Sequence, residues 1–197
     1  MKIEIEAKWL GVNHDDLRLK LKKLGAKQMR PLTEMVRAVF DLPNNLNKKN
    51  GWVRVRDEGD AITMSYKQVD DKSITGTKEV RLSVDDFENA VDFLNQVGLK
   101  QKSLQETKRE SWELDGVEID LDEWPWLPPF VEIEARNEEK LASVAESLGF
   151  AMSDAMHGSA DFVYAKYYDV TIDEVNAWVE IKFGETPEWL AGKKRES

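Results

Sequence analysis

Charged side chains recur at every second position along most of the strand-like stretches of this chain, and this alternation limits the possible folds more than any other feature. Residues 3–9 show it first, since Glu4, Glu6 and Lys8 alternate with apolar or small residues. Such alternation predicts a β-strand, because successive side chains of a strand point to opposite faces of the sheet. A flat sheet would leave the charged face in water. A sheet closed into a barrel, with its apolar face against helices, would instead enclose the charges.

The chain is predicted to be an α+β protein, because helical segments interrupt the strand-like stretches. Strands are expected over residues 3–9, 36–42, 52–56, 61–67, 77–84, 108–114, 117–121 and 130–135. Helices are expected after Asn13, over 86–97 behind Asp85, and over 138–148, each followed by a glycine. The Asp-Gly dipeptide at positions 115 and 116 predicts a hairpin turn between two strands.

Composition excludes several classes of protein. The chain has no cysteine and only two histidines, which excludes disulfide scaffolds, thiolate zinc sites, cysteine nucleophiles and a histidine-rich metal site. Its 28 basic and 38 acidic residues give a net charge of −10, which argues against general nucleic-acid binding. The N-terminal stretch is acidic rather than apolar, and no apolar run approaches the roughly 20 residues of a membrane span. We therefore expect a cytoplasmic protein whose partners include neither nucleic acid nor membrane.

The alternating positions combine acids and bases in a pattern with a definite chemical use. Carboxylates two residues apart on one strand, such as Glu132 and Glu134, point the same way and can share a hard divalent cation. Arginines and lysines on facing strands can hold a polyanion, with guanidiniums as forked donors and ammoniums as point charges. Acids and bases in one cavity therefore indicate a site for a metal ion together with a polyphosphate.

These stretches resemble, in order, the strands of the CYTH, or triphosphate tunnel metalloenzyme, superfamily. Residues 4–8 match its ExExK signature, and residues 36–41 resemble its strand that ends in an aromatic residue and Asp. Residues 52–56 and 62–67 resemble its RxR strand and its strand ending in an inward lysine. The basic strand at 108–112 and the acidic strands at 117–122 and 130–134 complete the set. The resemblance covers residues 1–168 and leaves 169–197 as a C-terminal helical extension or tail, with a capping box at 171–174 and a frayed end from 185.

The resemblance implies an eight-stranded antiparallel β-barrel that forms a tunnel, with helices packed outside. It implies phosphate-binding roles for Lys8, Arg54, Arg56, Lys67 and Arg109. It implies a Mg²⁺ or Mn²⁺ cofactor, with metal-binding roles for Glu4, Glu6, Glu79, Asp120, Asp122, Glu132 and Glu134. Catalytic roles are expected on the first strand, at Lys8, Glu4 and Glu6.

The chain departs from the family pattern at three places. Arg37 stands, with Val39, where members often have a polar residue and Tyr, and we expect Arg37 to be either an added phosphate contact or a salt-bridge partner. Arg81 stands where a second Glu often follows Glu79, so it joins the candidate phosphate-binding residues. The basic strand usually has Lys-x-Arg, but here Thr107 takes the lysine position. Alternation then favours an inward Arg109, and a bulge would be needed to turn Lys108 inward as well.

The resemblance leaves several functions open. We favour metal-dependent hydrolysis of a triphosphate, with inorganic tripolyphosphate or a nucleoside triphosphate as the small-molecule substrate. The alternative enzyme is a class IV adenylyl cyclase, which would use almost the same residues; the retained pair Glu132 and Glu134 favours hydrolysis over it. A non-catalytic polyphosphate or nucleotide sensor and a plain interaction module are the other two hypotheses, and a homodimer is left open.

Overall fold

Eight antiparallel strands of the chain close into a barrel, as predicted, in a computed structural model that describes residues 1–43, 51–71 and 73–195. The barrel strands are β1 (Lys2–Leu10), β2 (Lys27–Asp41), β3 (Gly51–Asp57), β4 (Ile62–Val69), β5 (Thr77–Val84), β6 (Lys100–Leu114), β7 (Val117–Glu123) and β8 (Phe130–Ala135). Their order around the barrel is β2-β3-β4-β5-β1-β8-β7-β6, and a pairing of β2 with β6 closes the ring.

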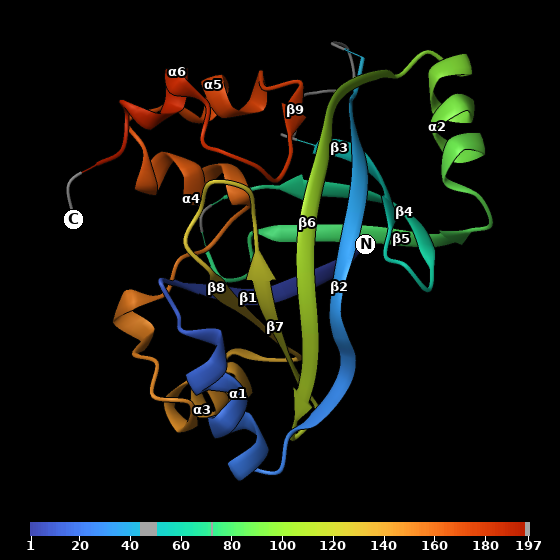
Figure 1. The fold of residues 1–197 in the computed structure, drawn as a ribbon. Helices are drawn as coiled ribbons and strands as arrows, with labels where there is room; N and C mark the ends of the chain where they lie inside the picture. The colour runs from blue at the N-terminus through green and yellow to red at the C-terminus, as the bar shows by residue number, and fades with distance from the viewer. Residues whose placement is uncertain (44–50, 72, 196–197) are drawn as a thin grey trace.

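The closing pair, β2 and β6, is longer than the sequence predicts. Each strand has 15 residues, and the two run side by side along the whole barrel in Figure 1. The alternation predicts only 36–42 and 108–114, because the first half of β2 is mostly exposed and has no apolar face. The register shifts twice between Gln28 and Thr33, next to Pro31, which has no backbone N–H to donate to a ladder.

The apolar core lies outside the barrel, between the strands and the helices. Helix α1 (His14–Lys23) and helix α3 (Glu138–Ser147) bury Leu17, Leu21 and Leu141 against the outward side chains of β1, β7 and β8, such as Ile119 and Ile133. Helix α2 (Phe87–Gln96) covers β3 and β6 on another side, and it is capped by Asp86 rather than by the predicted Asp85. Because the apolar faces point outward, the charged faces of the strands point into the barrel.

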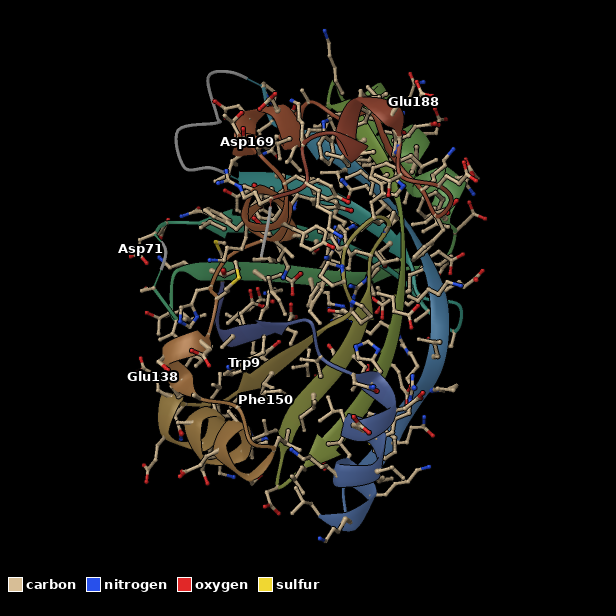
Figure 2. The ribbon with its side chains drawn as sticks, turned by 60° about the vertical axis from the view of Figure 1, so that its left-hand side comes forward. Trp9, Asp71, Glu138, Phe150, Asp169 and Glu188 are labelled. Atoms are coloured by element: carbon tan, nitrogen blue, oxygen red, sulfur yellow. The ribbon has the colours of Figure 1, made fainter. Side chains whose placement is uncertain are left out.

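Trp9 shows how the outer face of β1 is held in place. Its ring stacks on Phe150 with the centroids 5.3 Å apart, and Figure 2 shows the two side chains next to each other beside the barrel. Its Nε1 donates to the carbonyl of Ala151 at 2.9 Å, and the following Met156 forms a backbone bridge with Lys8. The segment just after α3 therefore ties down the strand that carries the ExExK signature.

The segment that follows α3, residues 152–195, is called here the C-terminal segment, and it is folded rather than frayed. It comprises a short 3₁₀ turn (Met152–Asp154), α4 (Ala160–Tyr167), α5 (Ile172–Asn176), β9 (Glu180–Ile181) and α6 (Glu188–Ala191). Figure 1 shows α4, α5, β9 and α6 at the end of the barrel opposite α1 and α3. The capping box at Thr171 and Glu174 is present, but the predicted fraying from residue 185 is wrong, since Leu190 is fully buried in α6. Within the described residues, no helix has the length and apolar character needed to cross a bilayer.

Candidate active site

The barrel encloses a charged cavity of about 1250 Å³, which reaches the C-terminal segment at one end. The predicted site residues that line it are Glu4, Glu6, Lys8, Arg37, Arg54, Arg56, Lys67, Glu79, Arg81, Arg109, Asp122, Glu132 and Glu134. Asp120 does not line it but is buried behind Arg109. Residues of α4, α5 and β9, among them Tyr164 and Ile181, cover one end of the same cavity. The alternation of charge in the sequence therefore identified one continuous internal surface.

Lys8 lies at the centre of a carboxylate pair. Its Nζ is 2.9 Å from Glu6 Oε1 on the same strand and 2.8 Å from Glu132 Oε2 on β8, which is its registered neighbour. Burial alone would lower the pKa of Lys8, but Glu132 and Glu6 outweigh it and raise this pKa. Burial would likewise raise the pKa of Glu132, which Lys8 and Arg109 instead hold low. Both side chains are therefore charged at neutral pH.

A second ion-paired group joins β1, β4 and β5. Lys67 Nζ is 2.8 Å from Glu4 Oε2 and 3.8 Å from Glu79 Oε1. Glu79 also accepts a 3.3 Å contact from Arg54. Burial, with a smaller contribution from Glu6, raises the pKa of Glu4 to about 7 against the opposing charge of Lys67. The position of Lys67 thus matches the predicted inward lysine.

Arg109 points into the cavity, as alternation favours, and Lys108 points out of it. Arg109 makes two parallel hydrogen bonds to Asp122, at 2.7 and 2.6 Å, and a third to Asp120. Ser111 also donates to Asp120, and burial raises the pKa of this carboxyl to about 8 although Arg109 opposes the shift. Lys108 instead pairs with Glu34 on the outside at 2.8 Å, and the register shows no bulge there.

Two other arginines, Arg37 and Arg54, are less completely neutralised. Among the residues that the structure describes, no carboxylate pairs with Arg37, whose Nε donates to Gln105 and whose guanidinium lies 3.9 Å from the centre of the Trp124 ring. Arg54 Nε is buried without a hydrogen-bond partner in the same set of residues. Burial and the neighbouring guanidiniums lower the pKa of Arg37, and burial together with Arg56 lowers that of Arg54 to about 9. A buried donor without a partner, such as Arg54 Nε, together with a guanidinium that has no carboxylate partner, marks a place where an anion would be stabilised.

Glu58 is a charged residue of the cavity that was not among the predicted site residues. This carboxylate accepts hydrogen bonds from Arg56 at 2.7 Å, Arg81 at 2.6 Å and Arg30 at 2.8 Å. It follows the same alternation as Arg54 and Arg56, so its inward position had a signal in the sequence. The strand was predicted to end at Arg56, which placed Glu58 in a loop.

The predicted metal ligands do not form a ready metal site. Within the described residues, no group of three or more Asp, Glu or His side chains is arranged to hold a metal ion. The carboxylates are instead held by Lys8, Lys67 and Arg109, and Glu134 by Lys2 at 2.7 Å. Their oxygen-only donor set nevertheless fits a hard divalent cation, and cross-strand register places Glu6 beside Glu134 and Asp120 beside Glu132. A cation bound there would compete with ammonium and guanidinium groups for these oxygens.

The fold and the cavity together define a class, an antiparallel barrel protein with a charged interior. The chain belongs to the CYTH domain family, whose model matches residues 2–164. Enzymes of this family are triphosphate hydrolases or cyclases, and they generally depend on a divalent metal ion. A comparison with curated proteins gives no significant match.

Three solved structures show the same fold. The PH1012 protein of Pyrococcus horikoshii is 28% identical with a TM-score of 0.64, and the match covers 78% of this chain and 94% of that chain. A candidate adenylate cyclase of Vibrio parahaemolyticus is 16% identical with a TM-score of 0.70, covering 83% of this chain and 98% of that chain. A candidate adenylyl cyclase of Hippeastrum, described as having a dominant triphosphatase activity, is 14% identical with a TM-score of 0.53, covering 80% and 92%. At such identities the last two show the fold alone.

Proposed function

We propose that this protein hydrolyses a triphosphate, either inorganic tripolyphosphate or a nucleoside triphosphate, inside the barrel with the help of Mg²⁺ or Mn²⁺. The observation that carries the proposal is a pair of incompletely paired cavity arginines. Arg37 has no carboxylate partner among the described residues, and Arg54 has a buried Nε without a hydrogen-bond partner there beside one 3.3 Å contact to Glu79. They face the same cavity as a set of carboxylates, so one enclosed volume offers both anion-binding and cation-binding groups. That combination suits a polyphosphate bound together with a metal ion.

The basic side chains bind and orient the phosphates. Arg37 and Arg54 have free donors for phosphate oxygens, while Arg56, Arg81, Lys67 and Arg109 already donate to carboxylates and would share or exchange those contacts. Lys8 is held between Glu6 and Glu132 and stays protonated, so its Nζ can stabilise negative charge on the attacked phosphate. Catalysis then rests on position and charge, with no covalent intermediate on the protein.

The acidic side chains serve the metal and the attacking water. Glu79, Asp120, Asp122, Glu132 and Glu134 would hold the cation together with Glu4 and Glu6. A bound divalent cation neutralises phosphate charge and makes a water molecule more acidic. A carboxylate oxygen of Glu4 or Glu6 can accept the proton that the water loses, because both side chains line the cavity beside Lys67 and Lys8.

The experiment that tests the proposal is ³¹P NMR of the products formed from tripolyphosphate and from ATP, each with Mg²⁺ or Mn²⁺. Hydrolysis gives orthophosphate with pyrophosphate from the first substrate and orthophosphate with ADP from the second. Cyclic AMP with pyrophosphate from ATP would replace the proposal by the cyclase reaction. If these substrates and thiamine triphosphate give no product, the proposal is wrong. An increase in Tm on adding tripolyphosphate would in that case favour a binding protein.

A further inference from the structure

The carboxylate of Glu58 lies among three arginines, in a position that would otherwise suit a phosphate. It lies just after β3, lines the cavity and is only 3% exposed. Its Oε1 accepts from Arg56, Arg81 and the Thr63 hydroxyl at 2.7, 2.6 and 2.9 Å. Its Oε2 accepts from Arg30 at 2.8 Å, and Arg30 also pairs with Asp60 at 2.8 Å. Three cationic side chains are thus committed to one internal anion.

The inward-facing arginines of β3 therefore differ in how completely they are paired with carboxylates. Arg54 has a buried Nε with no partner among the described residues and one longer contact, 3.3 Å, to Glu79. Arg56, two residues further on, gives two hydrogen bonds to Glu58. Burial alone would raise the pKa of Glu58, but Arg56, Arg30 and Arg81 outweigh it and lower this pKa to about 2. Glu58 is therefore an anion throughout the neutral range.

We propose that Glu58 ends the phosphate-binding track of the cavity and so limits the number of phosphates in the substrate. The inference rests on the proposed function for the chemistry of its ligand and adds a chain-length limit. A phosphate lying past Arg56 would approach a buried carboxylate, which repels it and already holds the guanidinium donors that the phosphate needs. Rejection of a longer chain by a built-in like charge is a recognised way to obtain specificity.

A purely structural role for Glu58 makes a different prediction, and the chain contains a matched control. Glu110 is also 3% exposed, and it accepts from Arg18, Gln28 and Trp112 at 2.8, 2.9 and 2.8 Å. It does not line the cavity and ties α1 to the outside of the barrel. If Glu58 only clamps arginines, Glu58→Gln and Glu110→Gln should both lower Tm and leave the preference for chain length unchanged.

The experiment measures affinity by calorimetry in metal-free buffer for tripolyphosphate and for tetrapolyphosphate. We expect the wild-type protein to gain no affinity from the fourth phosphate. In Glu58→Gln the affinity for tetrapolyphosphate relative to tripolyphosphate should rise roughly tenfold, as expected for removing one charge about 10 Å away at an effective dielectric constant of about 20. Glu110→Gln should keep the wild-type ratio, and Glu58→Asp should keep it too, because the negative charge is retained.

An unchanged ratio in a folded Glu58→Gln protein would overturn the inference. A wild-type protein that binds tetrapolyphosphate and longer chains progressively more tightly would also overturn it, and this result needs no variant to fold. Orthophosphate release from tripolyphosphate with Mg²⁺ is measured in parallel. Hydrolysis with an unchanged ratio contradicts the chain-length limit alone, whereas a changed ratio without hydrolysis contradicts the proposed function alone.

Discussion

The cavity has two walls that differ in how completely their cationic side chains are paired with carboxylates. On the first, called here the paired wall (Glu6, Lys8, Arg109, Asp122 and Glu132), each cation has carboxylate partners within 2.9 Å. The second, called here the unpaired wall (Arg37 and Arg54), is incompletely paired. One guanidinium rests on an aromatic ring; the other has a single 3.3 Å contact to Glu79 and a buried nitrogen with no partner among the described residues. Both walls carry buried positive charge, but the first neutralises it with close carboxylate partners and the second does so only in part.

The difference indicates how one barrel can serve two opposite ligands. Burying an unpaired charge is unfavourable, so the unpaired wall is stabilised when an anion supplies the missing partner. The paired wall is already satisfied and offers oxygen atoms only to a cation that can displace an ammonium or a guanidinium. The anion is therefore expected beside β2 and β3, and the metal beside β1, β7 and β8.

The largest expected effect is a loss of turnover when a carboxylate of the paired wall is removed. Glu132→Gln should lower kcat for tripolyphosphate by about a thousandfold, or about 4 kcal/mol, because it removes a proposed metal ligand and the charge beside Lys8. The amide oxygen can still accept from Lys8, so circular dichroism should show an intact fold. Glu110→Gln serves as the control outside the cavity. A folded Glu132→Gln protein with wild-type kcat would show that this wall does not hold the metal.

The second largest effect is a difference in the free energy of unfolding between a variant of the paired wall and a variant of the unpaired wall. Arg109→Met should lower the free energy of unfolding by about 3 kcal/mol, because Asp120 and Asp122 are left buried without their partner. Arg54→Met should lower it far less or raise it, since the guanidinium it removes is itself incompletely paired. Urea unfolding at pH 7 measures both. The opposite ranking of the two variants would remove the distinction between the walls.

A smaller effect concerns substrate binding by the unpaired wall. Arg54→Ala should raise KM for tripolyphosphate about tenfold, or about 1.4 kcal/mol, with a smaller change in kcat, because it removes a charged donor to phosphate. Lys108→Ala is the matched control, since Lys108 lies outside the barrel and pairs with Glu34. Equal KM values for the two variants would show that Arg54 does not contact the substrate.

Much of the barrel could be predicted because period-two alternation is a local property of the chain. It placed the eight strands and the inward side of Arg109, and Asp115 with Gly116 indicated the hairpin, in which both residues adopt positive φ (54° and 77°). The outer halves of β2 and β6 were missed because their pairing is set by the partner strand, while the local pattern around Pro31 is polar and irregular.

The ion pairs could not be predicted in the same way, because they depend on which strands become neighbours. Lys8 meets Glu132 only because β1 pairs with β8, although the two residues are far apart in the chain. The C-terminal extension and its capping box were predicted, but the packing of its end was missed for a related reason. Trp178, Ile181 and Leu190 are too scattered to form a period, yet they gather with Trp124 and Tyr164 in one cluster.

The last effect concerns Glu58, which follows the incompletely paired Arg54 and the fully paired Arg56 along the same inward-facing row of side chains. Arg56, Arg30 and Arg81 lower the pKa of Glu58 to about 2, whereas the pKa is near 4.5 in an unfolded chain. The ionised Glu58 therefore contributes its full stabilisation to the fold at pH values above 4.5. The stabilisation is lost as the pH falls from about 4.5 toward 2, by up to about 1.4 kcal/mol per pH unit. The difference in unfolding free energy between wild type and Glu58→Gln should thus be constant from pH 7 to 5 and shrink below it. Other carboxylates titrate in both proteins and cancel, so a difference that stays constant down to pH 3 would mean that Glu58 is not held by its arginines in solution.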